Sequence, residues 1–425
     1  MPGQLQYNKL MAKYKIRETR AQLSLFTNEE KRVTDYKTGK RPTLPEEVTP
    51  KTRPEALNLN WREKDLPERI RTKHVHRLHP YLGKFVPQLV EIFLRMYFKP
   101  GDTVYDPFCG SGTTLVEANA LDINAVGCDI SSFNCLLSSV KTQHYNLQKA
   151  KSEILDILQR TESVARPDLF SKNNGHDIPN TTNAYLLDWY APQARRALLT
   201  YHNYIQDYHY RDLLRIILSR SARSARLTTH FDLDFPKKPQ TEPYQCYKHS
   251  RICTPTQEAL GFLRRYSLDT SRRIEEFAAI QTDAKVQVIC DDSRYVNLPK
   301  KLSGIITSPP YVGLIDYHEQ HRYAYELLGL MDKSHLEIGA AKRGASQAAK
   351  QEYRQSIAEV FRHAAEYMKK DAVAVVVVHD KHSLYPEVAG ECGFEVAHVI
   401  ERHVNRRTGR RAGEFFEQIY IWRRK

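Results

Sequence analysis

The residues best suited to chemistry form a short turn, Thr307-Ser308-Pro309-Pro310-Tyr311, directly after the apolar run Gly304 to Ile306. Two successive prolines offer no backbone N–H, so a strand must end there. Because both proline φ angles are fixed, the carbonyls of Ser308 and Pro309 are held in place and accept hydrogen bonds from an amino group. Tyr311 adds a flat face on which a base stacks. The turn therefore suits an extruded nucleobase that carries an exocyclic amino group.

A second set of polar residues lies at 102–114, which reads DTVYDPFCGSGTT and precedes an apolar-periodic stretch at 115–121. This pattern predicts a strand, a glycine turn and a helix, the opening unit of a nucleotide-binding α/β fold. The loop has neither the G-x-G-x-x-G of dinucleotide enzymes nor the lysine of a phosphate loop. Asp106 at the strand end favours the positively charged sulfonium of S-adenosylmethionine over NAD or ATP, since a sulfonium needs a nearby carboxylate and no phosphate cradle.

Two further predicted strands also end in carboxylates. The strand at 124–128 closes with Asp129, which follows Gly110 at about the 20-residue spacing of an acid that binds ribose hydroxyls. The strand at 286–290 ends in Asp291 and Asp292, whose carboxylates are suited to accept a hydrogen bond from an adenine amino group. Because parallel strands meet ligands at their carboxyl ends, these groups indicate one nucleoside-type cofactor site.

Together these motifs resemble the S-adenosylmethionine-dependent DNA amino-methyltransferases. The stretch TSPPY is similar to the catalytic motif of that family, DPFCGSGTT to its cofactor loop, and residues 79–85 to the segment that packs on the methionine end of the cofactor. In the family, a leading Ser is more usual for cytosine N4 and a leading Asp for adenine N6. The resemblance thus implies methyl transfer from S-adenosyl-L-methionine to N4 of a flipped cytosine in DNA, with a cognate restriction endonuclease as an implied partner.

The resemblance also assigns roles to residues. The catalytic residues it implies are Ser308, Pro309, Pro310 and Tyr311. The cofactor-binding residues it implies are Lys84, Phe85, Asp106, Phe108, Gly110, Gly112, Thr113, Asp129, Ile130 and Asp292. The family usually has a Gly-Asp pair at the third strand end, so Asp292 takes the adenine contact and Asp291 stands where glycine is usual. Asp316 and Tyr317 are expected to line the base pocket, although Asp316 reads equally well as a helix cap.

Four other functions are compatible with parts of this sequence. Carbon-5 methylation of cytosine needs a thiolate, usually from a Pro-Cys turn, and the chain has no Pro-Cys dipeptide. Adenine N6 methylation uses the same chemistry, and only the leading Ser argues against it. RNA guanine-N2 methyltransferases carry similar loops but usually add a sizeable N-terminal RNA-binding domain. A catalytically inactive binding protein is disfavoured because the cofactor acids, the glycines and SPPY are all intact.

Composition agrees with a nucleic-acid substrate. The 425 residues include 64 Lys+Arg and 50 Asp+Glu, a net charge of +14 that favours a polyanionic partner. No apolar run reaches the roughly 18 residues of a membrane span, and the N-terminal stretch lacks the apolar core of a signal peptide, so we expect a cytoplasmic protein with no membrane partner. Seven cysteines, an odd number, favour reduced thiols over a disulfide framework.

The predicted fold class is α/β: a Rossmann-like, mostly parallel methyltransferase sheet with C-terminal antiparallel strands and a mostly helical insertion. Residues 1–70 are a polar, basic arm that either touches nucleic acid or wraps the surface. Residues 71–145 form the cofactor-binding half, 146–283 the insertion and candidate target-recognition region, and 284–425 the catalytic half. In the last of these, the valine-rich run 372–378 predicts a strand buried on both faces.

Within the insertion, Arg220, Arg223 and Arg226 recur at a spacing of three, so in a helix they share one face. We expect this face to track DNA phosphates, although a solvated face of a packed helix is the alternative.

No metal site is predicted. His74, His76 and His79 have no acidic or cysteine ligand beside them in the sequence. Cys246 and Cys253 lie near histidines, but Cys-x6-Cys is not a usual zinc spacing, so these residues read as ordinary loop and core residues.

Overall fold

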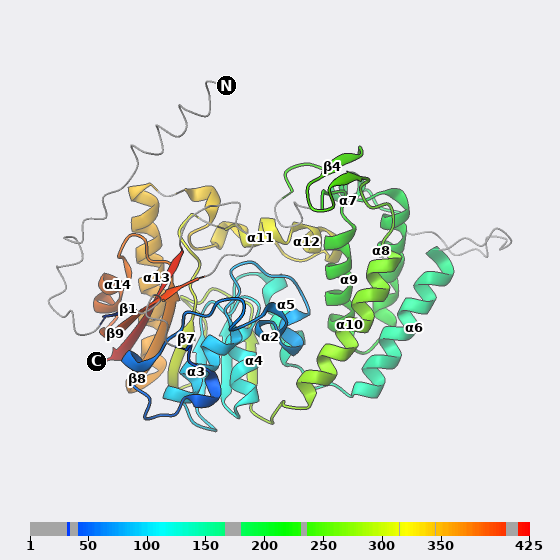
Figure 1. Ribbon diagram of the computed structural model, residues 1–425. Coiled ribbons are helices and arrows are strands. Elements are labelled where there is room, and N and C mark those ends of the chain that lie inside the picture. Colours follow the sequence, from blue (N-terminus) through cyan, green and yellow to red (C-terminus); the bar gives the residue numbers. More distant parts are fainter. Residues whose placement is uncertain are drawn as a thin grey trace, which may run out of the picture.

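The computed structural model describes residues 32–34, 41–165, 180–230, 236–313, 315–344, 346–404 and 415–425 (Figure 1). Its strands are β1 (Arg32–Thr34), β2 (Thr103–Asp106), β3 (Asn124–Cys128), β4 (Tyr244–Cys246), β5 (Arg251–Cys253), β6 (Val286–Ile289), β7 (Leu302–Thr307), β8 (Met368–Val378), β9 (Phe394–His403) and β10 (Phe416–Arg424). Its α-helices are α2 (Glu68–Arg71), α3 (Pro87–Tyr97), α4 (Thr113–Ala120), α5 (Ser132–Thr142), α6 (Leu147–Ala165), α7 (Ala184–Trp189), α8 (Pro192–Tyr204), α9 (Arg211–Ala225), α10 (Leu260–Ala278), α11 (Tyr317–Gln320), α12 (Arg322–Leu328), α13 (Gln347–Tyr367) and α14 (Tyr385–Glu391).

One large sheet organises the molecule. Its described strands run in the order β1-β9-β10-β8-β7-β2-β3-β6. Strand β10 is antiparallel to β8 and β9, and the other neighbouring pairs are parallel. The predicted α/β class, with a mostly parallel sheet and antiparallel pairing near the C-terminus, is therefore confirmed. Strands β7, β2, β3 and β6 are consecutive neighbours, which brings the three predicted cofactor strands next to the strand that carries the proline turn.

The centre of the sheet is covered on both faces. Along β8, side chains alternate between two cores: Val375 packs with residues of α3 and α4, whereas Val376 packs with residues of α13 and α14. Such alternation follows from the period of two of a strand, and burial of both sets explains why the sequence 372–378 is continuously apolar. The predicted doubly buried strand is confirmed.

The described part of the N-terminal arm lies against this sheet domain. Val48, Leu57 and Leu59 are buried in the same core as α3, and β1 pairs in parallel with β9. Residues 1–31 and 35–40 lie outside the described residues. In its described residues the arm therefore wraps the surface of the sheet domain, which is one of the two predicted arrangements.

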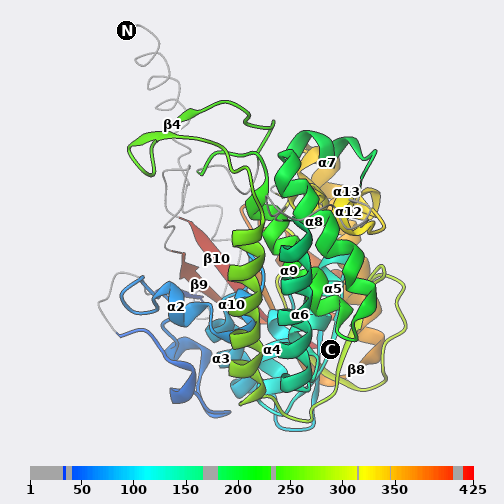
Figure 2. The ribbon, with the colours of Figure 1, turned by 90° about the vertical axis from the view of Figure 1, so that its right-hand side faces the viewer.

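The insertion is a helical layer beside the carboxyl end of the sheet. Helices α6, α8, α9 and α10 lie side by side (Figure 2) and share one apolar core, which also takes residues from α5 and α12 of the sheet domain. The insertion is therefore packed against the sheet domain through α5 and α12. Among the described helices, none combines the length and apolarity needed to cross a bilayer.

Candidate functional site

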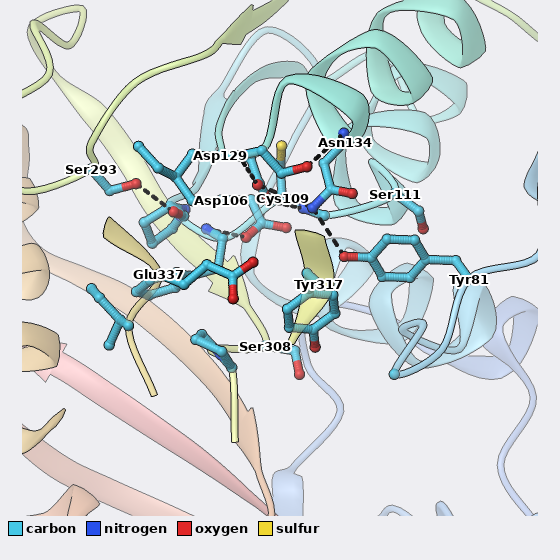
Figure 3. Close-up of a pocket in the computed structure, with 18 of the residues that line it drawn as sticks. Tyr81, Asp106, Cys109, Ser111, Asp129, Asn134, Ser293, Ser308, Tyr317 and Glu337 are labelled. Carbon is cyan, nitrogen blue, oxygen red and sulfur yellow. Dashed lines mark hydrogen bonds between the residues drawn. The ribbon is translucent and has the colours of Figure 1, made fainter. Parts of the chain in front are cut away.

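The carboxyl ends of β7, β2, β3 and β6 meet at one edge of the sheet and border a cavity (Figure 3). Its empty volume, including the open mouth, is about 860 Å³. The residues predicted from the sequence that line it are Lys84, Phe85, Asp106, Phe108, Gly110, Thr113, Asp129, Ile130, Asp292, Ser308, Pro310 and Tyr317. The structure therefore brings the cofactor loop, the strand-end acids and the proline turn to one cavity.

The glycine loop approaches its neighbours too closely for a side chain. Gly110 has φ +47°, and a Cβ there would lie 2.9 Å from the hydroxyl of Tyr81. Gly112 has φ +75°, and a Cβ there would lie 2.8 Å from Oγ of Ser138. Both positions thus require glycine, for backbone conformation and for space. Gly112 is not among the cavity-lining residues; it lets the start of α4 pack against α5.

Asp129 is held by three hydrogen bonds (Figure 3). The backbone N–H of Gly110 donates to its Oδ2 at 2.8 Å, and its Oδ1 accepts from the N–H of Ser131 at 2.9 Å and from Nδ2 of Asn134 at 3.1 Å. Nδ2 of Asn134 also lies 3.2 Å from the hydroxyl of Tyr81. Burial raises the pKa of Asp129 although these hydrogen bonds oppose the shift. The carboxyl group thus has a fixed orientation at the cavity wall.

Asp106 joins β2 to β7 at the base of the cavity. Its Oδ1 accepts hydrogen bonds from Oγ1 of Thr307 at 2.7 Å and from the N–H of Phe108 at 3.2 Å. Burial raises the pKa of Asp106 to about 6, with these hydrogen bonds opposing. Since Thr307 immediately precedes Ser308, the same bond links the cofactor loop to the proline turn.

The third strand end presents two acids to the cavity, Asp291 and Asp292. Oδ2 of Asp292 forms an ion pair with Nη2 of Arg294 at 2.6 Å. Burial opposes ionisation, but the hydrogen bonds and charge of Arg294 hold the pKa of Asp292 below its ordinary value. Asp291, at the position where the resemblance predicted glycine, also lines the cavity wall.

The proline turn is braced from two sides. Ser308 and Pro310 line the cavity, whereas Pro309 and Tyr311 are not among its lining residues. The hydroxyl of Tyr353 donates to the carbonyl of Pro310 at 2.8 Å, and the hydroxyl of Tyr311 donates to Oε1 of Glu417 at 3.0 Å. These bonds fix the turn to α13 and to β10.

Of the two residues predicted to line the base pocket, one borders the cavity and the other does not. Tyr317 lines the cavity, and its ring stacks on that of Tyr81 with centroids 5.7 Å apart. Asp316 is not a lining residue; its Oδ1 accepts a hydrogen bond from the N–H of Lys342 at 3.2 Å. Asp316 precedes α11 without a side-chain capping bond, so it does not act as the helix cap.

Two of the three arginines predicted to contact phosphates, Arg220 of α9 and Arg226 directly after it, pack against the protein instead. Arg220 pairs with Asp269 of α10 at 2.7 Å, and its guanidinium lies 4.1 Å from the ring centroid of Tyr266. Arg226 is only 4% exposed and stacks over Tyr323 of α12. Arg223 is half-buried between them. Arg220 and Arg226 therefore pack within the protein, and their spacing reflects packing.

Several lining residues were not predicted from the sequence. Glu337 reaches the cavity from the loop after α12, and its Oε1 accepts a hydrogen bond from the N–H of His318 at 2.9 Å. Tyr81, Asn134 and Ser293 also line the cavity. Tyr81 lies in the segment that resembles the methionine-end segment of the family, which was the one available signal; Glu337 had none, because its loop reads only as small and basic.

Comparison with known proteins places this site in a family. A model for DNA methylases matches residues 7–139. The Type II methyltransferase M.MjaII of Methanocaldococcus jannaschii is 38% identical over 436 residues, covering 84% of this chain and 81% of that protein. The Type II methyltransferase M.MvaI of Kocuria varians is 25% identical over 250 residues, covering 56% of this chain and 53% of that protein. A tRNA (guanine(10)-N2)-dimethyltransferase of M. jannaschii is 31% identical over 90 residues, only 21% of this chain and 25% of that protein. On this evidence the chain belongs to the N6/N4 family of S-adenosylmethionine-dependent DNA methyltransferases.

Proposed function

We propose that this DNA methyltransferase transfers the methyl group to the exocyclic N4 of cytosine. The observation that carries the proposal is Ser308, which follows β7 directly, stands where adenine enzymes of this family usually have Asp, and lines the same cavity as Asp106 and Asp129. The alternative is adenine N6, which uses the same direct transfer.

The cavity suits S-adenosylmethionine on two structural grounds. The backbone at Gly110 lies at the cavity surface with no space for a Cβ, and three separate strand ends present carboxyl groups to it. In the proposed assignment, Asp129 accepts hydrogen bonds from the ribose hydroxyls, and Asp292 accepts one from the adenine amino group. Asp106 lies nearest the sulfonium. Lys84, Phe85, Phe108, Thr113 and Ile130 complete the proposed contacts. When bound, this cofactor supplies an activated methyl group.

The chain's own residues then orient the acceptor. An exocyclic amine is a poor nucleophile because its lone pair is delocalised into the ring. Hydrogen bonds from its two N–H groups to the side chain of Ser308 and to the carbonyl of Pro309 would favour a tetrahedral nitrogen with its lone pair directed into the cavity. Because Tyr353 and Glu417 brace the turn in advance, little ordering remains when the base enters.

The base must leave the duplex to reach this turn, at a cost of a few kcal/mol. Stacking on the ring of Tyr311 would return about 1–3 kcal/mol of that cost. Tyr317, stacked on Tyr81 at the cavity wall, is the second proposed base contact. Asp316 stays a weaker proposal, since its carboxylate is engaged by the backbone of Lys342.

The test is to express the chain in a host that lacks DNA amino-methylation and to analyse nucleosides from its DNA and RNA by mass spectrometry. We expect N4-methyldeoxycytidine, in a smaller amount when the Ser308→Ala variant is expressed at the same level. N6-methyldeoxyadenosine instead would establish the alternative. A methylated base found only in RNA would refute a DNA substrate.

We further propose a restriction endonuclease that acts on the same DNA site, because the relative M.MjaII is a Type II methyltransferase. Lysate of the source organism should then cut unmodified DNA and leave DNA methylated by this chain intact. A DNA substrate and seven free cysteines also support a cytoplasmic location.

A further inference from the structure

A second group of reactive side chains lies outside the cavity, in the hairpin formed by β4 and β5. Cys246 ends β4, Cys253 ends β5, His249 lies in the turn between them, and His230 comes from the chain that precedes the hairpin. One ligand atom from each of these four residues lies within 4.8 Å of the other three. Figures 1 and 2 place the hairpin at one end of the helical insertion. The sequence-based interpretation as unrelated loop and core residues did not anticipate this convergence.

The distances within the group are those of ligands around one metal ion. Nδ1 of His230 lies 3.6 Å from Sγ of Cys246, and Nδ1 of His249 lies 3.7 Å from Sγ of Cys246 and 3.6 Å from Sγ of Cys253. Tetrahedral zinc, with Zn–S near 2.3 Å and Zn–N near 2.0–2.1 Å, separates sulfur from nitrogen by about 3.6 Å. The observed separations match that geometry.

Hydrogen bonding alone does not account for these contacts. Nδ1 of His249 faces two sulfur atoms, yet an imidazole nitrogen has a single in-plane position with which to donate or accept. A hydrogen bond therefore accounts for only one of the two sulfur contacts of His249 Nδ1, whereas a single shared cation accounts for both.

The hairpin also lacks another source of stability. Its two strands pair with each other and with no further described strand. Tyr247 and Ile252 are 86% and 71% exposed, whereas Cys246 and Cys253 are only 2% and 7% exposed. An isolated two-stranded hairpin is marginally stable in water. Its buried cysteines lie beside the exposed His230 and His249, so a shared metal would hold the hairpin together as it does in small metal-binding domains.

Nδ1 of His230 has one more polar neighbour, which is not a member of the group. The hydroxyl of Tyr244 also lies 2.9 Å from Nδ1 of His230. That nitrogen serves either the hydroxyl or a metal, so metal binding would displace this hydrogen bond.

The other histidine group of the chain contrasts with this one. His74, His76 and Glu117 also lie close together. However, Nζ of Lys73 is 2.8 Å from Oε2 of Glu117, and Nε2 of His76 is 2.7 Å from Oε1. An ammonium group already neutralises the carboxylate and occupies the place of a cation there.

We propose that His230, Cys246, His249 and Cys253 bind one structural zinc ion that closes the β4–β5 hairpin. Two thiolates and two imidazoles are a typical zinc ligand set, and four protein ligands leave no open position for catalysis. The thiolates balance the charge of the ion, so the closed hairpin presents its basic tip residues, Lys248 and Arg251, without added charge from the site.

The experiment is to purify the untagged full-length chain from zinc-supplemented cells, dialyse it, and measure its metal by mass spectrometry. We expect about one zinc ion per chain in the wild type and below about one-tenth in Cys246→Ser and Cys253→Ser. The exposed cysteine outside the group gives the matched control: Cys290→Ser should retain its zinc. Cobalt substituted for zinc should show the visible and charge-transfer absorption of tetrahedral thiolate coordination, and Cys246→Ser should lose it.

Binding of S-adenosylmethionine, measured by calorimetry, shows whether each variant is folded, because the cofactor cavity is built from other elements. Zinc lost in a variant that still binds the cofactor supports the proposal. Wild type without zinc, a Cys246→Ser variant that keeps its zinc, or a Cys246–Cys253 disulfide in freshly purified protein would each overturn it. None of these outcomes depends on which base the enzyme methylates.

Discussion

The backbone N–H of Gly110 donates a hydrogen bond to Oδ2 of Asp129 at 2.8 Å. This bond joins the glycine loop after β2 to the acid after β3, and Asn134 links the same carboxyl group to Tyr81. The cofactor loop, the second strand end and the aromatic wall are therefore one connected unit. Substitution of Gly110, Asp129, Asn134 or Tyr81 should therefore first change the affinity for the cofactor.

Gly110→Ala should weaken S-adenosylmethionine binding by at least about tenfold, because the new methyl group meets the Tyr81 hydroxyl at 2.9 Å in a backbone conformation that itself costs about 1–2 kcal/mol. Gly101→Ala is the matched control, since Gly101 has φ +83° with no atom within 4 Å of the added Cβ. Calorimetry of Gly110→Ala with Tyr81→Phe should show partial recovery. Equal effects at Gly101 and Gly110 would refute the steric argument.

Affinity for S-adenosylmethionine should fall in acid if Asp106 faces the sulfonium. Burial holds the pKa of Asp106 at about 6, so the carboxylate loses its charge as the pH drops through that value. At one pH unit below this pKa the ionised fraction, and with it the affinity, is reduced by roughly tenfold. S-adenosylhomocysteine, a neutral thioether, should show a much smaller change in calorimetric titrations. Equal pH dependence of both ligands would contradict the assignment.

The free energy of unfolding of the unliganded protein should depend on pH in the opposite direction. Because the pKa of Asp106 is raised in the folded protein, the native state binds this proton more tightly than the unfolded state does. The contribution of Asp106 to the free energy of unfolding therefore increases as the pH falls through about 6. Asp106→Asn should remove this component of the pH dependence in denaturant titrations.

Ser308→Ala should slow methyl transfer by about tenfold or more while leaving cofactor affinity unchanged, since it removes one hydrogen bond to the acceptor amine. Ser308→Thr keeps the hydroxyl and should retain more activity than the alanine variant. Single-turnover transfer of a labelled methyl group to DNA measures the rate. Full activity of Ser308→Ala would remove Ser308 from the proposed catalytic turn.

The two functions of Tyr311 can be separated. Tyr311→Phe keeps the ring and loses the bond to Glu417, whereas Tyr311→Ala loses both. If stacking of the flipped base matters most, Tyr311→Ala should lose about 1–3 kcal/mol of DNA affinity, and Tyr311→Phe should lose much less. Similar losses in both variants would mean that the hydroxyl, through its brace on β10, is the essential part.

The parts of the site that the sequence predicted are those built by local rules. Asp106, Gly110 and Asp129 belong to strand–turn–helix units whose spacing is fixed by the fold, and two prolines end β7 wherever they occur. The burial of 372–378 likewise follows from its continuous apolar run. Such features need only short stretches of sequence.

The parts that escaped prediction depend on contacts between distant segments. Glu337 reaches the cavity through a loop without periodicity, and His230 meets Cys246 only because the chain returns to the hairpin. Parallel pairing of β1 with β9 joins segments more than three hundred residues apart. The spacing of Arg220, Arg223 and Arg226 did predict a common helix face, but not that the face is covered by α10 and α12.

Arg220 provides the test of that correction. Since it pairs with Asp269 and stacks on Tyr266 inside the insertion, Arg220→Ala should lower the free energy of unfolding by about 1–2 kcal/mol. Arg215→Ala in the same helix, whose ion pair with Asp212 is more exposed, should cost no more than about 0.5 kcal/mol. Neither change should alter the slope of log Kd for DNA against log salt concentration. If Arg220 contacted a phosphate, that slope would fall by about one in Arg220→Ala with stability unchanged, and the assignment of this arginine to packing would be wrong.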